Sequence, residues 1–227
     1  MRVIYSLTPN LYPVLLPSIM SLLDHNEVEK IYILAMDERL PYELPEVCEV
    51  IKVDPMDYIK PDSPNIKCVW TPMCLVRLAT AKIIPDDKVL QLDVDTIIND
   101  SLEPLWNIDL TGNYFAMAKE TKADYRPFGE NYYNCGVCLI NLKKLREDHA
   151  DDKLLEYINT KKTMCVDQDA INSLGHIVEF PSRYNECFAT GYSENPAIVH
   201  YAAISEWWIP ISTPRWSYYG KYEKYER

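Results

Sequence analysis

The sequence predicts an α/β protein whose central, mostly parallel mixed sheet is flanked by helices. Apolar, β-prone runs alternate with helical patterns along the first half of the chain, and this order is typical of parallel sheets covered by helices. The chain has 227 residues, of which 48% are hydrophobic, so it can bury a sizeable core. We therefore expect a single compact domain over residues 1–227.

Short apolar runs mark the expected strands, at residues 3–7, 28–36, 47–53, 89–92, 114–118, the first part of 133–145, and 197–201. Apolar residues at helical spacing predict helices over 9–23, 71–84, 151–161 and 166–174. The first two have Pro9 and Pro72 in their first turn, where Pro is tolerated. Residues 119–133 are polar and irregular, and we expect a flexible substrate loop there.

Composition excludes several classes of function. The formal net charge is −11, which disfavours nucleic acid as a partner because binding it needs a cationic surface. Only six glycines occur, and no glycine-rich phosphate-binding motif is among them. Seven scattered cysteines, no signal-like start and no apolar run of membrane-spanning length predict a cytoplasmic protein with reduced thiols. Peripheral membrane contact stays open.

Two carboxylates follow the strand at 89–92, and they are the first candidate site. Asp93 and Asp95 lie two positions apart, a spacing that points both side chains the same way in an extended chain. They would repel each other without a positive partner, and hard divalent cations prefer oxygen ligands. An Asp-rich turn is the alternative. Ligands of parallel sheets bind at the carboxyl ends of strands, where Thr8 and Asn10 should also lie.

His200 follows the apolar run near the end of the sequence. A lone His in such a place is more often structural, but imidazole is also a common metal ligand. Two Asp and one His would form a mixed oxygen and nitrogen site that suits Mn²⁺ or Mg²⁺ better than structural zinc.

Three further motifs have competing interpretations. Cys135 and Cys138 form C-x-x-C, but they lie in an apolar strand pattern, where positions three apart point to opposite faces, so a redox or zinc site is disfavoured. Residues 167–169 are Asp-Gln-Asp, which either stabilise a helix N-terminus or bind sugar hydroxyls. The D-x-D at Asp93 also resembles Mg²⁺-dependent phosphatases of the haloacid-dehalogenase type, although about ninety residues precede it here.

Taken together, the sequence resembles glycosyltransferase family 8, which includes bacterial lipopolysaccharide galactosyltransferases and glycogenin. His200-Tyr201 fits the last metal ligand of that family. Four segments in the family's order carry the rest of the resemblance: Arg77-Leu78, residues 89–106 with the D-x-D, residues 134–145 beginning Asn-Cys-Gly, and residues 167–172 beginning Asp-Gln-Asp.

The resemblance implies a GT-A fold and retaining transfer of a hexose, glucose or galactose, from a UDP-sugar to a hydroxyl acceptor such as a glycan. It implies that Asp93, Asp95 and His200 hold Mn²⁺ or Mg²⁺, and that Glu120 lies near the acceptor. Asp167 and Gln168 would be catalytic, with Gln168 nearest the reacting face. The implied donor-binding residues are Thr8, Asn10, Arg77, Asp93, Val94, Asp95, Asn134, Cys135, Gly136, Asp167, Gln168 and His200.

Two departures from the family pattern affect this expectation. Thr8 stands near the place of an Asp that reads uracil, and the residues after His200 lack the family's Gly and Lys. Losing a charge-assisted phosphate contact could cost about 1.5–3 kcal/mol, unless Arg215 or Lys221 replaces it. The alternatives are therefore a degenerate relative that binds nucleotide-sugar with little turnover, or a Mg²⁺-dependent phosphatase.

Overall fold

The computed structural model describes residues 1–67, 71–122, 124–202 and 215–226. Its centre is a seven-stranded sheet in the order β3-β2-β1-β4-β7-β6-β8. Only β7 runs antiparallel to its neighbours, and every other pair is parallel, which confirms the mostly parallel mixed sheet. The strands are β1 (Arg2–Ser6), β2 (Lys30–Ala35), β3 (Cys48–Lys52), β4 (Lys88–Leu92), β6 (Phe115–Lys119), β7 (Tyr133–Asn141) and β8 (Ile177–Phe180).

A second, two-stranded sheet lies beside the first. It pairs β5 (Thr96–Ile98) antiparallel with β9 (Ile198–His200). The sequence places an apolar run at 197–201 but does not foresee β5, or β8 in the main sheet. Three or four residues are too few to show a period of two, so the pairing partner decides these short strands.

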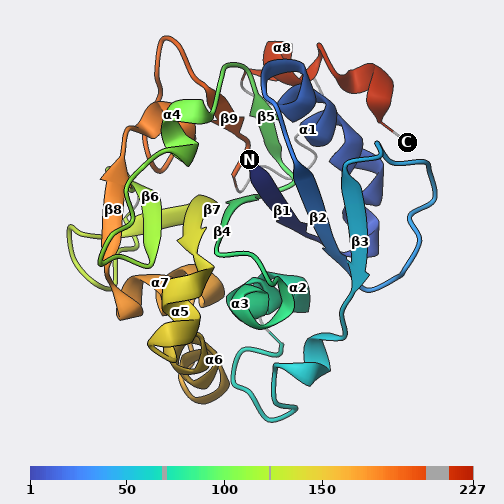
Figure 1. Cartoon of the computed structure of the whole chain (residues 1–227). Helices are drawn as coiled ribbons and strands as arrows, with labels where there is room; N and C mark the ends of the chain where they lie inside the picture. Colours follow the sequence, from blue (N-terminus) through green and yellow to red (C-terminus); the bar gives the residue numbers. More distant parts are fainter. Residues whose placement is uncertain (68–70, 123, 203–214, 227) are drawn as a thin grey trace.

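Helices cover both faces of the main sheet (Figure 1). On one face, α1 (Tyr12–His25) packs with β5, β9 and the helix α8 (Trp216–Tyr219) around a shared hydrophobic cluster. On the other face lie α2 (Pro72–Val76), α3 (Thr80–Ile83), α5 (Leu142–Glu147), α6 (Ala150–Thr160) and α7 (Val166–Leu174). The short α4 (Glu103–Trp106) follows β5. None of the helices in the described residues is long and apolar enough to cross a bilayer.

The helix predicted over 71–84 is interrupted. A 3-10 turn, Arg77–Ala79, separates α2 from α3. The Arg77 carbonyl accepts both the backbone amide of Thr80 and the Thr80 hydroxyl, the latter at 2.6 Å, as expected for the i to i+3 bonding of a 3-10 turn. Arg77 therefore lies at a break between helices, with its side chain buried.

Strand β7 is irregular at the end that carries Asn134 and Gly136. Its pairing with β6 shifts register between Met117 and Ala118. Cys135 and Cys138 consequently pack into the same hydrophobic cluster, so the expectation that they point to opposite faces is wrong. Burial raises the pKa of the Cys135 thiol, which argues against a reactive thiolate.

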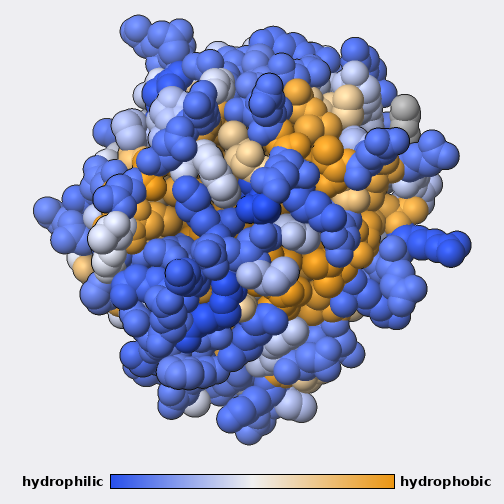
Figure 2. All heavy atoms as spheres, viewed as in Figure 1, coloured by the Kyte–Doolittle hydropathy of each residue, from blue (hydrophilic) through white to orange (hydrophobic). Residues whose placement is uncertain are grey.

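Hydrophilic residues form most of the surface in this view, and hydrophobic residues reach it in separate patches, the larger ones in the half of the picture that holds β2 and β3 (Figure 2). This distribution agrees with the high charge of the sequence.

Candidate functional site

The D-x-D sequence forms a turn between two sheets. Strand β4 ends at Leu92, and the Asp93 amide donates to the carbonyl of Gly136 at 2.8 Å. Thr96 is the first residue of β5, and its hydroxyl donates to the Asp93 carbonyl at 2.7 Å. The two carboxylates are thus brought together by a hydrogen-bonded turn. Val94, between them, is buried in the core.

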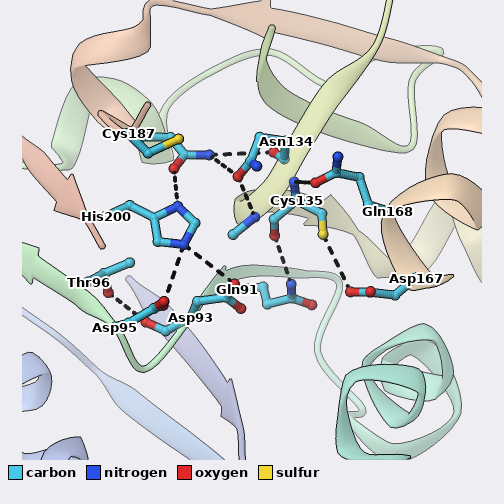
Figure 3. Close-up of polar contacts among 12 residues, drawn as sticks. Gln91, Asp93, Asp95, Thr96, Asn134, Cys135, Asp167, Gln168, Cys187 and His200 are labelled. Atoms are coloured by element: carbon cyan, nitrogen blue, oxygen red, sulfur yellow. Dashed lines mark hydrogen bonds and ion pairs between the residues drawn. The ribbon is translucent and has the colours of Figure 1, made fainter. Parts of the chain in front are cut away.

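His200 reaches the same turn through β9. Because Thr96 is its partner in the β5–β9 pair, the imidazole faces both carboxylates (Figure 3). Its Nε2 lies 3.4 Å from Asp95 Oδ1 and 3.7 Å from Asp93 Oδ2. One ligand atom from each of the three residues lies within 4.8 Å of the others. Two carboxylates and an imidazole are a hard, mixed donor set, so these residues fit a Mn²⁺-class cation.

Gly136 leaves the space in which the imidazole lies. A Cβ atom at this position would lie 2.1 Å from His200 Cε1, a distance no side chain can occupy. The glycine in this part of β7 therefore has a packing reason, in addition to any contact with a donor.

Arg77 is the buried counter-charge of the site. Its guanidinium contacts Asp93 Oδ1 at 2.5 Å and Asp167 Oδ2 at 3.1 Å. Asp167, in the first turn of α7, also accepts from the Cys135 thiol at 3.4 Å. Figure 3 shows Asp167 and Cys135 turned toward each other. The Arg77 guanidinium therefore links the D-x-D turn to the first turn of α7.

Two side-chain amides and one carboxylate, joined by hydrogen bonds, form another part of the site. The side chains of Asn134 and Gln168 both donate to Glu120 Oε1, at 2.8 and 3.0 Å. Gln168 Oε1 accepts from the backbone amide of Cys135 at 3.1 Å. Both ends of the Gln168 amide are thus fixed by protein groups, which holds its orientation without a ligand.

Burial and neighbouring charges shift the pKa values of three ionisable groups in the site. Burial alone would lower the pKa of His200, but the adjacent Asp95 carboxylate outweighs it and raises that pKa well above its usual value. Burial opposes ionisation of Asp95, yet His200 holds the Asp95 pKa below its usual range. Burial raises the pKa of Glu120, against hydrogen bonds from Asn134 and Gln168.

Most of the predicted residues surround one cavity of about 330 Å³. Thr8, Asn10 and Val94 are not on its wall. Thr8 and Asn10 follow β1, next to β4 in the sheet, and the Thr8 hydroxyl donates to Asn10 Oδ1 at 2.5 Å. The predicted residues on the wall are Arg77, Asp93, Asp95, Glu120, Asn134, Cys135, Gly136, Asp167, Gln168 and His200.

The structure adds residues that the sequence reasoning missed. Tyr125 and Phe188 line the cavity, and Asn185 contacts His200 from behind. Tyr125 lies in the segment predicted as a substrate loop, which was a signal that could have pointed to it. Asn185 follows a 3-10 turn and belongs to no motif, so no pattern in the sequence indicates it.

Neither basic residue proposed to replace the family's Lys is on the cavity wall. Arg215 Nε lies 2.9 Å from the buried Glu186 carboxylate, and Lys221 donates to Asn99 at 3.1 Å. Residues 203–214, which hold most of the departing run, lie outside the described residues. Within the part of the chain that is described, Arg77 is the one Lys or Arg side chain on the wall.

Comparison with known proteins gives a consistent family. The family model "Glycosyl transferase family 8" matches residues 3–209. A putative glycosyltransferase of Haemophilus influenzae is 33% identical over 123 residues, which cover 48% of this chain and 37% of that protein. Glycosyltransferase GlyD of Streptococcus pneumoniae is 29% identical over 88% of this chain and 27% of its own length. The chain thus spans well under half of these curated relatives.

Solved structures share the fold. An active-site mutant of LgtC superposes with a TM-score of 0.81 at 21% identity, covering 99% of this chain and 95% of that one. The galactosyltransferase LgtC in complex with donor and acceptor sugar analogs gives a TM-score of 0.76 at 22% identity with the same coverage. At this identity the likeness establishes the GT-A architecture alone.

Proposed function

The chain belongs to glycosyl transferase family 8, and from this premise we propose that it transfers a hexose, glucose or galactose, from a UDP-sugar to a hydroxyl group of a glycan with retention of configuration. The observation that supports this most is the cavity itself. Its wall carries both the Asp93–Asp95–His200 cluster and the side chains of Glu120 and Gln168.

The metal end of the site would hold Mn²⁺ or Mg²⁺ through Asp93, Asp95 and His200. Such a cation supplies Lewis-acid stabilisation of the charge that develops on a departing diphosphate. Arg77, fixed between Asp93 and Asp167, adds a second positive charge at the same end. Together they offset the acidic field of the chain, whose formal net charge is −11.

The sugar end would orient the donor hexose. Asn134, Asp167 and Gln168 present amide and carboxylate groups toward the cavity, which suit sugar hydroxyls. Thr8 and Asn10 lie beyond the wall at the end of β1, where they would receive the uridine. The donor would then span from the surface near β1 to the buried α7 wall.

The contacts favour front-face attack. Gln168 is a poor nucleophile, and the Asp167 carboxylate is paired with Arg77 and accepts from Cys135, which reduces its nucleophilicity. The acceptor oxygen would bond to the anomeric carbon on the face from which the diphosphate leaves, as the anomeric C–O bond breaks. The acceptor proton would pass to an oxygen of the departing phosphate.

The acceptor side is the mouth of the cavity. Both hydrogen bonds to Glu120 reach Oε1, so Oε2 can accept from an acceptor hydroxyl. Phe188 is 51% exposed while lining the cavity, and Tyr125 lies there with its hydroxyl bonded to Asp169 at 2.8 Å. Aromatic faces of this kind stack on the apolar faces of sugar rings.

Release of UDP from UDP-glucose and UDP-galactose, with and without Mn²⁺, tests the proposal. We expect Mn²⁺-dependent release that Asp95→Asn abolishes and added glycan acceptors accelerate. Nucleotide binding without release from either sugar would support the alternative, a degenerate relative with little turnover. Release that ignores the metal would overturn the proposed role of the cluster.

A further inference from the structure

Asn185 lies behind the imidazole of His200, on the side away from the two carboxylates. Its Oδ1 is 2.7 Å from His200 Nδ1, and its Nδ2 donates to Asn134 Oδ1 at 2.9 Å. Asn185 is 0% exposed and His200 is 5% exposed, so bulk water does not compete for these bonds. The two side chains must satisfy each other.

The donor and acceptor of each hydrogen bond in this series can be assigned by starting from groups that can only donate or only accept. The Gly136 backbone amide can only donate, and it donates to Asn134 Oδ1 at 3.0 Å. The Asn134 Nδ2 group donates to the Glu120 carboxylate at 2.8 Å. Both contacts give the same orientation of the Asn134 amide, with its oxygen toward Gly136.

That orientation determines the next two groups. Because Asn134 Oδ1 is an acceptor, Asn185 must turn its Nδ2 toward it and its Oδ1 toward His200. An amide oxygen accepts, so His200 Nδ1 must carry a proton. A metal binds the neutral imidazole, which has one donor and one acceptor nitrogen. With the proton held on Nδ1, the lone pair of that neutral form is on Nε2, the atom that faces Asp93 and Asp95.

The backbone holds Asn185 in place for this role. The carbonyl of Asn185 accepts from the Thr190 hydroxyl at 2.5 Å. The next residue, Glu186, exchanges backbone hydrogen bonds with β9, from its amide to Ile198 and from His200 to its carbonyl, at 3.0 and 2.8 Å. The Asn185 position is therefore anchored to the strand that carries the metal-ligand candidate.

We propose that Asn185 is a positioning residue that fixes His200 in the tautomer able to bind a metal, with Asn134 and Glu120 fixing Asn185 in turn. The inference rests on the proposed function for the identity of the cation. It extends that function by linking the metal end to the sugar end, because Gln168 donates to the same Glu120 oxygen. Partners of this kind typically change metal affinity by about 10–100-fold when removed.

Two substitutions separate the functions of the Asn185 amide. Asn185→Ala removes the side-chain bonds to His200 and to Asn134, and we expect Mn²⁺ affinity, measured from the EPR signal of free Mn²⁺, to fall about 10–100-fold. Asn185→Asp keeps an oxygen opposite Nδ1 but places an acceptor against Asn134 Oδ1. We expect its Mn²⁺ affinity to stay close to that of the unmodified protein, while turnover falls because the Asn134–Glu120 wall is disturbed.

Asn65→Ala is the matched control. Asn65 is also a buried amide, 1% exposed, and it bonds backbone groups of residues 158, 161 and 163, which are absent from the cavity wall. It should lower stability as Asn185→Ala does without changing Mn²⁺ affinity. Equal affinity losses in both variants would show that Asn185 acts only through general stability and would overturn the proposal.

Ring ¹⁵N NMR tests the tautomer without any metal. The chain has four histidines, so histidine-labelled protein gives few signals. At a pH where the ring is neutral, we expect His200 to be protonated at Nδ1, and Asn185→Ala to move the proton toward Nε2. A neutral ring protonated at Nε2 instead of Nδ1 in the unmodified protein would overturn the inference. Absence of Mn²⁺ binding would instead count against the proposed cofactor, and the NMR result would still decide the role of Asn185.

Discussion

The two ends of the proposed donor site are built in different ways. At the metal and sugar end, Asn134, Gln168, Asn185 and His200 are each 8% exposed or less and are joined by protein hydrogen bonds. At the nucleoside end, Asn10 is exposed on a 3-10 turn and bonds only its neighbour Thr8 in the contacts described. The first end is preorganised before any ligand binds, which lowers the cost of reaching the reactive geometry.

Stability and ligand binding should therefore be coupled at the buried end and separate at the exposed end. Substitutions in the buried network should change folding and ligand binding together. Substitutions near Asn10 should change nucleotide binding while folding stays nearly constant.

The largest effect should come from Arg77→Ala. It leaves Asp93 and Asp167 without their shared buried counter-charge, which costs about 3–5 kcal/mol of unfolding free energy. Urea unfolding measures it. Arg183→Ala is the matched control, since Arg183 pairs with Asp100 at 2.7 Å in a more exposed setting and should cost about 0–1 kcal/mol. Equal losses would erase the contrast between the buried end and the surface.

Gly136→Ala should have the next largest effect. The added Cβ would meet the His200 ring, and overpacking of this kind costs about 1–3 kcal/mol. Calorimetry with and without Mn²⁺ should show lower stability and no stabilisation by the metal. The double variant Gly136→Ala with His200→Ala should recover part of the stability but not the metal response. No recovery would mean that the clash lies elsewhere.

Glu120→Gln should change the pH dependence of stability. Burial raises the Glu120 pKa in the folded protein, so the unmodified protein loses stability as pH rises through that pKa. Gln keeps an oxygen acceptor and has no charge to bury. The variant should therefore gain relative stability as pH rises from about 4 through the folded-state pKa of Glu120, because each unit of pKa shift corresponds to about 1.4 kcal/mol. Urea titrations across this range check it, and a pH-independent difference would contradict it.

The smallest effect on folding should come from Asn10→Ala. An exposed substitution of this kind changes the unfolding free energy by about 0.5 kcal/mol or less. Loss of one hydrogen bond to uridine should weaken UDP binding about 2–10-fold, measured by calorimetric titration. Mn²⁺ affinity serves as the internal control and should not change. A large loss of stability would show that this end is also part of the rigid network.

Much of the fold follows from local patterns in the sequence. The apolar runs and helical spacings place β1 to β4, α1, α6 and α7 close to their observed bounds. The pairing of β5 with β9 could not be predicted, because residues about a hundred positions apart decide it. The same holds for the break at Arg77, where contacts with Asp93 and Asp167 add to local propensity.

Some residues of the site can be predicted from the sequence, and others only from the fold. The spacing of Asp93 and Asp95 already indicates paired carboxylates, whereas the position of His200 beside them depends on the non-local β5–β9 pair. Asn185 is an ordinary Asn after a turn until the fold places it against the imidazole. Its chemistry depends on direction of hydrogen bonding, which a sequence pattern does not contain.

Thermal unfolding with UDP, in the presence and absence of Mn²⁺, shows whether this cavity binds a nucleotide diphosphate through a metal. If Asp93, Asp95 and His200 hold a cation that binds the diphosphate, UDP and Mn²⁺ together should raise the melting temperature by more than the sum of their separate effects. Asp95→Asn and His200→Ala should remove that excess. No stabilisation by UDP under any condition would show that this cavity is not a nucleotide-sugar site.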